Sequence, residues 1–198
     1  MSERPPLYGL LLAGGKSSRM GRDKALISYR AGETQLEYGV RLLSEVVSCV
    51  FISQRANQAF PVPEGCGTVL DSMEELQGPG CGILSAMAQH PEADWLVIAC
   101  DLPNLETVTL SKLIAAYHAQ SERGPVAYQS THDRLPEPLC AIYPKEMAPT
   151  LIALTRETGR MCPRFWLIRQ EAALIEQDDP SALDNANTPD ECEAMRKS

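Results

Sequence analysis

The sequence predicts an α/β protein with a mostly parallel central sheet, covered by helices on both faces in a three-layer, Rossmann-like arrangement. Uninterrupted apolar runs at residues 7–12, 49–53 and 95–100 are typical of strands that are buried on both faces. Between the first two runs, apolar residues recur at helical spacing over 36–47, which predicts an amphipathic helix that begins near Thr34. A helix between two buried strands indicates a right-handed crossover, and ligands of such sheets bind at the carboxyl ends of the strands.

The overall composition fits a single compact domain spanning residues 1–198. Apolar residues make up 44% of the chain and charged residues 22%, which is ordinary for a globular domain. The net charge of −8 argues against nucleic acid as a partner, because proteins that bind nucleic acid carry a basic surface. No apolar run approaches the roughly 18 residues that cross a bilayer, so we expect no membrane segment, no signal peptide and a cytoplasmic location.

Seven cysteines are scattered along the chain without a C-x-x-C pair, which indicates neither a disulfide framework nor a zinc site. Cys49, Cys100 and Cys140 stand inside apolar runs, so we expect buried, unreactive thiols at these positions. This usage fits a reducing compartment.

The first strand leads directly into a glycine pair, Gly14 and Gly15, which is followed by the cations Arg19 and Lys24. Adjacent glycines tolerate positive φ and let backbone N–H groups approach an anion. Arg19 offers a planar fork and Lys24 a point charge, and both can reach back over the same loop. Neither the P-loop pattern nor the G-x-G-x-x-G fingerprint fits this segment. We therefore expect a polyphosphate ligand, the alternative being a tight strand-to-helix turn with solvated cations.

Polar residues also stand at the ends of the next two strands. Ser53 closes the second strand, where it could contact a base or ribose or could be a plain strand terminus. Asp71 ends a short strand at residues 69–70. The segment that follows has glycines at positions 78, 80 and 82 before an apolar helical run. This pattern indicates either a ligand close to the backbone or a tight contact between helix and sheet.

Asp101 follows the apolar strand at residues 95–100, and Pro103 prevents the strand from continuing. A single carboxylate at such a strand end suits Mg²⁺, which takes one or two protein carboxylates and completes its shell with water and phosphate oxygens. A carboxylate beside a polyphosphate would be electrostatically unfavourable without a cation, so Asp101 and Mg²⁺ are expected together. The alternative is that Asp101 caps the following helix.

The second half of the chain predicts helices at residues 105–119 and 145–154 and strands at 124–128 and 139–143. The stretch between the two strands, 132–138, is polar and contains prolines. It is a candidate lip for a second substrate.

Two arginines and two amides complete the candidate residues. Arg164 and Arg169 could contact a phosphate or the phosphate of a pterin, although exposed, solvated arginines are the more common explanation. Asn185 and Asn187 lie on one side of an extended segment before a helix that Thr188 opens. We favour a role for the two amides in binding metal, water or the second substrate over a role in catalysis.

Residues 11–26, LLAGGKSSRMGRDKAL, resemble the L-A-G-G-x-S-x-R-M-G-x-D-K signature of nucleotidyltransferases similar to molybdenum cofactor guanylyltransferase. Four further motifs resemble the same family in the same order. They are Asp71, the G-P-x-x-G-I stretch at residues 78–83, the D-x-P stretch at 101–103 and the N-x-N-T-P stretch within 185–191. Related cytidylyltransferases and sugar-nucleotide enzymes share the design, but their loops more often contain A-A-G or end in G-T-R.

The resemblance implies a three-layer Rossmann-like nucleotidyltransferase fold and a transfer reaction. GMP would pass from GTP to the terminal phosphate of molybdopterin cofactor, forming molybdopterin guanine dinucleotide and pyrophosphate with the help of Mg²⁺. Other proteins of cofactor biosynthesis or molybdoenzyme maturation are possible partners. The alternatives are a cytidylyl- or sugar-phosphate nucleotidyltransferase, or a catalytically silent nucleotide-binding regulator.

The family motifs also assign roles to particular residues of this chain. Arg19, Lys24 and Asp101 would be catalytic, Asp101 would bind the metal, and Asn185 and Asn187 would contact the second substrate. The nucleotide would be bound by Leu12, Ala13, Gly14, Gly15, Lys24, Ser53, Asp71, Gly78, Gly82 and Asp101. The sequence departs from the family at two positions, since Ser53 stands where Asn is common and Glu137 where some members carry His.

Overall fold

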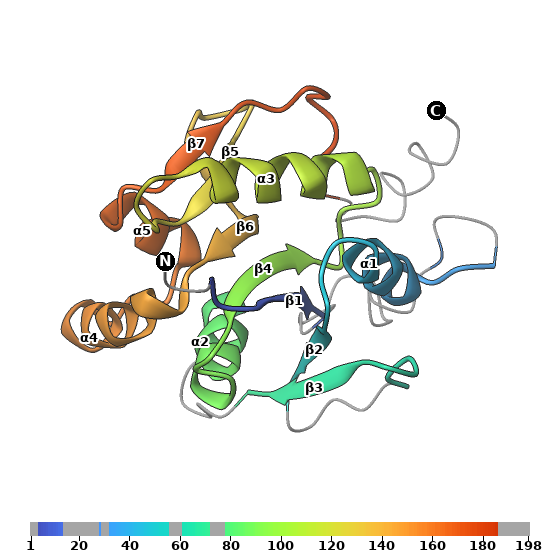
Figure 1. Cartoon of the computed structure of the whole chain (residues 1–198), viewed down its shortest axis with the longest axis horizontal. Helices are drawn as coiled ribbons and strands as arrows, with labels where there is room; N and C mark the ends of the chain where they lie inside the picture. Colours follow the sequence, from blue (N-terminus) through green and yellow to red (C-terminus); the bar gives the residue numbers. More distant parts are fainter. Residues whose placement is uncertain (1–3, 14–27, 29–31, 56–60, 72–77, 186–198) are drawn as a thin grey trace.

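The structure is a computed structural model that describes residues 4–13, 28, 32–55, 61–71 and 78–185 (Figure 1). The described residues form a seven-stranded sheet with the strand order β3-β2-β1-β4-β6-β5-β7. Its strands are β1 (Leu7–Leu12), β2 (Val50–Gln54), β3 (Gly67–Leu70), β4 (Asp94–Ala99), β5 (Val126–Gln129), β6 (Pro136–Tyr143) and β7 (Ala173–Ile175). Strand β6 runs antiparallel to both of its neighbours, and the other pairings are parallel. The prediction of a mostly parallel α/β sheet is confirmed.

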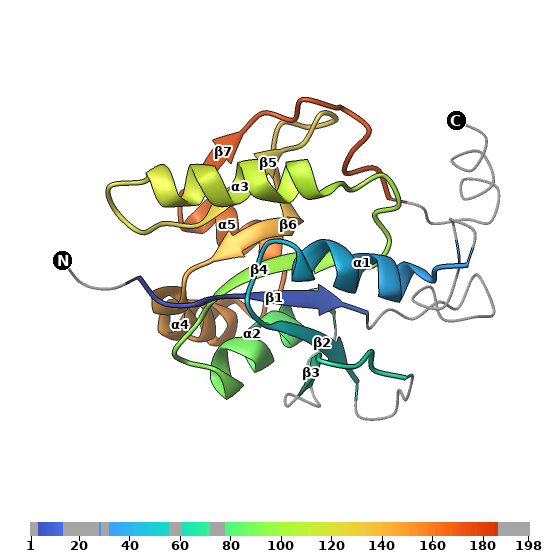
Figure 2. The ribbon, with the colours of Figure 1, turned by 45° about the vertical axis from the view of Figure 1, so that its right-hand side comes forward.

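Helices cover both faces of this sheet (Figures 1 and 2). The helices α1 (Gln35–Ser44) and α3 (Thr107–Ala119) pack on one face, and α2 (Pro79–Gln89), α4 (Ala148–Thr158) and α5 (Pro163–Arg169) pack on the other. Because side chains alternate along a strand, Leu11 of β1 contributes to the first core while Leu10 and Leu12 contribute to the second. The sheet is therefore buried on both sides at its centre, as its apolar runs predict.

The start of α1 explains why its sequence folds as a helix there. Thr34 is the N-cap, its hydroxyl accepts from the backbone N–H of Glu37, and the Glu37 carboxylate accepts from the backbone N–H of Thr34. This reciprocal arrangement satisfies two backbone donors that a helix end would otherwise leave unbonded. The prediction that this helix begins near Thr34 is confirmed.

The second half of the chain differs from prediction in three ways. Strand β6 begins at Pro136, so Glu137 and Pro138 belong to the sheet, and the candidate lip is reduced to the turn at residues 132–135. Helix α5 and strand β7 were not predicted, because seven and three residues are too short for a periodic pattern. The predicted helix at 145–154 is a short 3₁₀ turn at Lys145–Met147 followed by α4.

The cysteine prediction is partly wrong. Cys100 and Cys140 are buried, whereas Cys49 is exposed because it precedes β2 at the opposite end of the strand from the candidate site. Among the described residues, no helix combines the length and apolar character that crossing a membrane requires.

Candidate active site

The carboxyl ends of three parallel strands meet at one edge of the sheet. Leu12, the last residue of β1, lies opposite Ser53 of β2 on one side and Ala99 of β4 on the other. Ala13 follows with 1% of its surface exposed, and Asp101 stands two residues beyond the end of β4. The structure thus brings the strand ends that carry Leu12, Ala13, Ser53 and Asp101 to the same edge.

Asp101 lies at this edge as a partly buried carboxyl whose Oδ1 atom is shielded from solvent. It does not cap the following helix, because the N-cap of α3 is Glu106. Within the described ranges, no group of three or more His, Cys, Asp or Glu side chains could hold a metal ion. A cation bound at Asp101 would therefore take few ligands from this part of the protein and most from water and phosphate, as Mg²⁺ does.

Ser53 and Asp71 are joined by a hydrogen bond across the ends of β2 and β3. The Ser53 hydroxyl donates to Oδ1 of Asp71 at 3.2 Å, and the backbone N–H of Asp71 donates to the carbonyl of Gln54 at 3.0 Å. Burial raises the pKa of the Asp71 carboxyl, and the bond from Ser53 and the charge of Arg55 oppose this effect. The two residues form a polar pair that is well placed to meet a ligand at the outer part of the edge.

The glycines around the start of α2 have different structural roles. A Cβ at Gly82 would lie 2.4 Å from the Oγ of Ser53 and 2.9 Å from Leu12, so the helix can approach the sheet only because this residue has no side chain. A Cβ at Gly80 would lie 2.3 Å from the carbonyl oxygen of Met161. The alternative of tight packing therefore explains Gly80 and accounts for at least part of the requirement at Gly82.

Gly78 is a different case from Gly80 and Gly82. It is the N-cap of α2 with a φ of 111°, a conformation that favours glycine, and no described atom lies within 4 Å of its ideal Cβ position. Open space in front of the first turn of α2 is consistent with a ligand that approaches the backbone there.

A pocket of about 120 Å³ opens beside Asp101 at the same edge. Its lining includes Leu102, the residue that follows Asp101, and Asn185, a predicted second-substrate residue. The remaining lining residues are Glu137, Pro138, Leu139, Cys140, Arg164 and Leu183. The pocket therefore brings one of the two predicted amides close to the residue that follows Asp101 in the chain.

Arg164 is not a freely solvated cation. Its Nη1 donates to Oδ2 of Asp133 at 2.7 Å, and its Nη2 donates to Oε2 of Glu137 at 3.3 Å. Sequence reasoning missed this pair, because Glu137 and Arg164 are 27 residues apart and lie on different elements. Arg169, by contrast, is exposed at the end of α5.

The one cysteine of this pocket is chemically inert. Burial, reinforced by the nearby charge of Glu137, raises the pKa of the Cys140 thiol to about 12. The thiol is therefore protonated at physiological pH, and since only a thiolate is a good nucleophile, Cys140 contributes packing rather than covalent chemistry.

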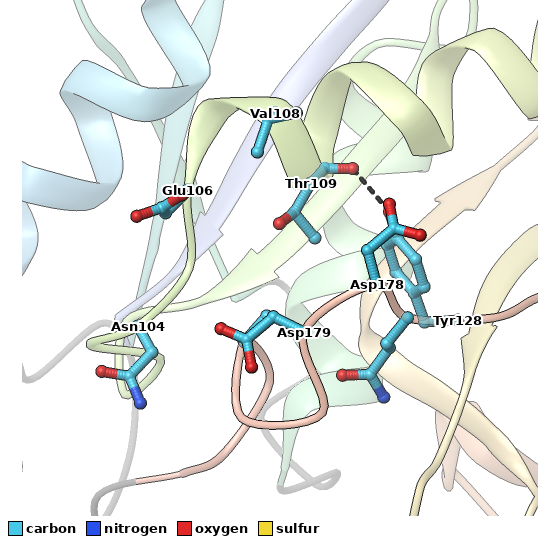
Figure 3. A pocket seen from close by; sticks show the side chains of 9 residues that line it. Asn104, Glu106, Val108, Thr109, Tyr128, Asp178 and Asp179 are labelled. Atoms are coloured by element: carbon cyan, nitrogen blue, oxygen red, sulfur yellow. Dashed lines mark hydrogen bonds between the residues drawn. The ribbon is translucent and has the colours of Figure 1, made fainter.

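A second pocket, of about 70 Å³, lies on the α3 side of the same edge (Figure 3). Two of its three acidic groups are engaged within the fold, since Asp178 accepts from Lys112 at 2.6 Å and Asp179 accepts from the backbone N–H of Ser181 at 2.8 Å. The hydroxyl of Tyr128 donates to the carbonyl of Thr109 at 2.8 Å. No residue that the sequence singled out lines this pocket, so we do not assign the site to it.

Five predicted site residues, Gly14, Gly15, Arg19, Lys24 and Asn187, lie outside the described residues. Their assignments remain predictions. The described residues fix the point from which the glycine loop departs, directly after Ala13 and between the ends of β2 and β4.

The fold and the polar strand ends define an α/β protein of the nucleotide-binding type, a class in which the carboxyl edge of the sheet is the usual place for a ligand. More specifically, the chain belongs to the family of the MobA-like NTP transferase domain, whose model matches residues 9–173. The predicted recognition and the predicted class of enzyme, a nucleotidyltransferase, are confirmed.

Similar proteins cover most of the chain. A molybdenum cofactor guanylyltransferase of Cupriavidus metallidurans is 31% identical over 96% of this chain and 95% of its own length. A molybdenum cofactor biosynthesis bifunctional protein of Synechocystis is 37% identical over 94% of this chain, which spans only 52% of that relative.

Solved structures support the fold. The molybdopterin-guanine dinucleotide biosynthesis protein A of Archaeoglobus fulgidus has a TM-score of 0.72 and 20% identity, with 96% of this chain and 97% of that chain covered. A Mycobacterium tuberculosis protein solved as a manganese complex has a TM-score of 0.65 and 16% identity, with 99% and 100% covered. At these identities the likeness concerns the fold alone.

Proposed function

We propose that the protein transfers GMP from GTP to the terminal phosphate of molybdopterin cofactor and releases pyrophosphate. The observation that carries this proposal is the register of Leu12 with Ser53 and Ala99. Because of this register, the chain leaves β1 toward the predicted phosphate-binding glycines between the end of β2, which we assign to the nucleoside, and the end of β4, which Asp101 follows. Relatives named as guanylyltransferases span nearly the whole chain, which favours guanylyl over cytidylyl transfer.

The reaction requires positioning more than acid–base chemistry. An oxygen of the acceptor phosphate forms a bond to the α-phosphorus of GTP while the bond from that phosphorus to the bridging oxygen breaks, and pyrophosphate leaves with the electron pair. A phosphate monoester is largely ionised at neutral pH, so no strong general base is needed. We assign the catalytic effect to orientation of the two substrates and to neutralisation of their charge.

On the nucleotide side, we assign the ends of β2 and β3 to the nucleoside. The carboxylate of Asp71 can accept from a ribose hydroxyl or from an N–H of the base, and the Ser53 hydroxyl holds its Oδ1 in place. Gly78 leaves room for the ligand at the start of α2. Ser53 is smaller than the Asn that is common at this position in the family. It would contact the nucleoside directly and would also orient the Asp71 carboxylate that binds it.

On the phosphate side, Gly14 and Gly15 would supply backbone donors, and Arg19 and Lys24 would neutralise charge on the triphosphate and on the leaving pyrophosphate. Asp101 would hold Mg²⁺, which supplies charge neutralisation between the phosphates when bound. The donor set fits, because one carboxylate leaves the coordination positions that phosphate oxygens and water occupy around Mg²⁺. The manganese complex of a structurally similar protein is consistent with a divalent cation in this fold.

The acceptor would enter from the other side of Asp101, where Asn185 lines the pocket that begins at Leu102. Asn187 would contact the same substrate. We place the reaction in the cytoplasm, without nucleic acid or membrane as a partner, and leave proteins of cofactor biosynthesis or molybdoenzyme maturation as possible partners.

Nucleotide choice tests this proposal. The purified protein is titrated with GTP, CTP and ATP, each with Mg²⁺, and binding is followed by calorimetry. We expect a clear preference for GTP, which Asp101→Ala weakens because the metal-bound triphosphate loses its anchor. A preference for CTP would redirect the assignment to cytidylyl transfer and to a different acceptor.

A further inference from the structure

The pocket beside Asp101 combines apolar walls with a charged pair in a way that suits a flat, neutral ring. Leu102, Leu139 and Leu183 line it together with Pro138. Glu137 and Arg164 provide its charged side chains, with 23% and 31% of their side-chain surface exposed. Pockets of this kind bind the face of a ring by apolar contact and fix its edge by a few polar groups.

The charge of this cluster decides between a phosphate and a ring. Arg164 faces two carboxylates, those of Asp133 and Glu137, so the formal charge of the three groups together is negative. Such a cluster disfavours a phosphate dianion, because the guanidinium is already neutralised and like charges repel. A ring that donates hydrogen bonds to a carboxylate meets no such penalty.

Glu137 and Arg164 retain hydrogen-bonding positions that a ligand could use. Among the described residues, Arg164 engages Glu137 through Oε2 only, and it uses Nη1 and Nη2 for its two carboxylate partners. A carboxylate can accept two parallel N–H bonds, and a guanidinium has five N–H donors in a planar fork. The pair therefore offers two adjacent acceptor positions beside a donor.

We propose that Glu137 and Arg164 determine the specificity for the second substrate by binding the 2-amino-4-oxopyrimidine edge of its pterin ring. Glu137 accepts from the 2-amino group and from N3–H, and Arg164 donates to the 4-oxo group. The apolar residues of the pocket contact the faces of the ring. This inference rests on the proposed function, since it concerns the acceptor of that reaction.

Guanine has the same hydrogen-bonding edge, but the sheet order separates the two sites. We assign the nucleoside to the ends of β2 and β3, whereas the pocket lies where β4 ends and β6 begins, and β1 lies between β2 and β4 in the sheet. Two rings can thus lie on opposite sides of Asp101, with their phosphates meeting near the centre. The two ring sites should be filled at the same time.

The test uses two probes, 6-hydroxymethylpterin and 6-hydroxymethyllumazine, which differ at position 2 of the ring and in the proton that lumazine carries on N1, and which share N3–H and the 4-oxo group. Lumazine has an oxo group where pterin has the amino group. Binding to the full chain, saturated with GTP and Mg²⁺, is measured by saturation-transfer NMR titration. We expect pterin to bind at least about tenfold more tightly than lumazine, because charge-assisted hydrogen bonds to the 2-amino group are lost in lumazine.

Variants separate recognition from folding. Glu137→Gln should weaken pterin binding by about tenfold or more and remove the preference over lumazine, because the new amide can donate to the 2-oxo group. Arg164→Lys keeps the charge but loses the planar fork, so it should weaken both probes equally through the shared 4-oxo group. Glu146→Gln is the matched control, since Glu146 forms a comparable 3.2 Å pair with Arg123 away from the pocket and should leave both affinities unchanged.

Three results would overturn the inference: equal binding of the two probes to the unaltered protein, a pterin preference that survives in Glu137→Gln, or displacement of pterin by GTP. With normal GTP binding and turnover, the first two results leave the proposed function standing. Failure of GTP to bind would instead contradict the proposed function itself.

Discussion

The hydroxyl of Ser53 donates to the Asp71 carboxylate at 3.2 Å, so a residue of β2 holds the acidic group that ends β3. The Oγ of Ser53 also lies only 2.4 Å from the position that a Cβ at Gly82 would occupy, so helix α2 packs closely against the serine from the other side. Ser53 is thus confined between a carboxylate and a helix backbone. This arrangement leads to the first two predictions.

Asp71→Asn should stabilise the fold while weakening nucleotide binding. Burial raises the pKa of Asp71 in the folded state above its value of 3.8 in the unfolded chain, so the ionised carboxylate costs stability at neutral pH. Asparagine removes this cost and still accepts from Ser53. The variant's advantage in urea unfolding should be present at pH 7 and should vanish as the pH falls through the folded pKa toward 3.8. A variant that is less stable than the parent at pH 7, or that binds GTP normally, would contradict this prediction.

Gly82→Ala should destabilise the protein by about 1–3 kcal/mol, because the new methyl group overlaps Ser53 and Leu12. Nucleotide affinity should fall as well, since Ser53 must shift. Gly124→Ala is the matched control, because the nearest atom would lie 3.9 Å from the new Cβ and the φ of Gly124 is outside the left-handed region that favours glycine. The measurement is chemical denaturation of both variants, and equal stabilities would show that the contact at Gly82 relaxes without cost.

Tyr117→Phe should cost stability without affecting the reaction. Its hydroxyl donates at 2.6 Å to Asp94, a carboxylate with 2% of its surface exposed that also accepts from the backbone N–H of Lys145. Removing a donor from a buried charged group costs about 1.5–3 kcal/mol. Asp94 begins β4 at the end opposite Asp101, so GTP affinity should stay unchanged. A loss of GTP affinity in folded Tyr117→Phe would contradict the prediction that Asp94 has no influence on the site at the other end of β4.

Cysteine alkylation should distinguish the pocket thiol from exposed ones. Because the pKa of Cys140 is about 12, only on the order of one molecule in ten thousand carries its thiolate at pH 8. Cys49 and Cys162 are exposed and should be modified first by iodoacetamide. Peptide mass spectrometry of the native protein over time checks the order. Rapid modification of Cys140 in the folded protein would show that the pocket activates it.

The sequence predicts the centre of this fold better than its periphery. The sequence predicts strand β1 correctly because a parallel strand buried on both faces leaves an uninterrupted apolar run. Helix α1 is predictable from its apolar spacing and from Thr34 at its start. Helix α5 has only seven residues, and its stability depends on burying Trp166 against α2 and the sheet, a tertiary contact that no local pattern reports.

The site shows the same limit. Asp101 could be predicted because a lone carboxylate after an apolar strand is conspicuous in the sequence. The pair of Glu137 and Arg164 could not, because the sequence gives no sign that β6 begins early enough to bring Glu137 beside α5. The glycines at positions 80 and 82 are visible in the sequence, but only the backbone geometry shows that close packing, rather than a ligand, requires glycine at Gly80 and contributes to the requirement at Gly82.

Product formation tests the central claim most directly. The protein is incubated with Mg²⁺, molybdopterin cofactor and GTP labelled at the α-phosphate, and both the labelled dinucleotide and pyrophosphate are quantified. The account predicts equal amounts of the two products with GTP, little with CTP, and a loss of at least about hundredfold in Asp101→Ala that remains folded by circular dichroism. GTP binding without pyrophosphate release, or near-normal turnover in folded Asp101→Ala, would contradict it.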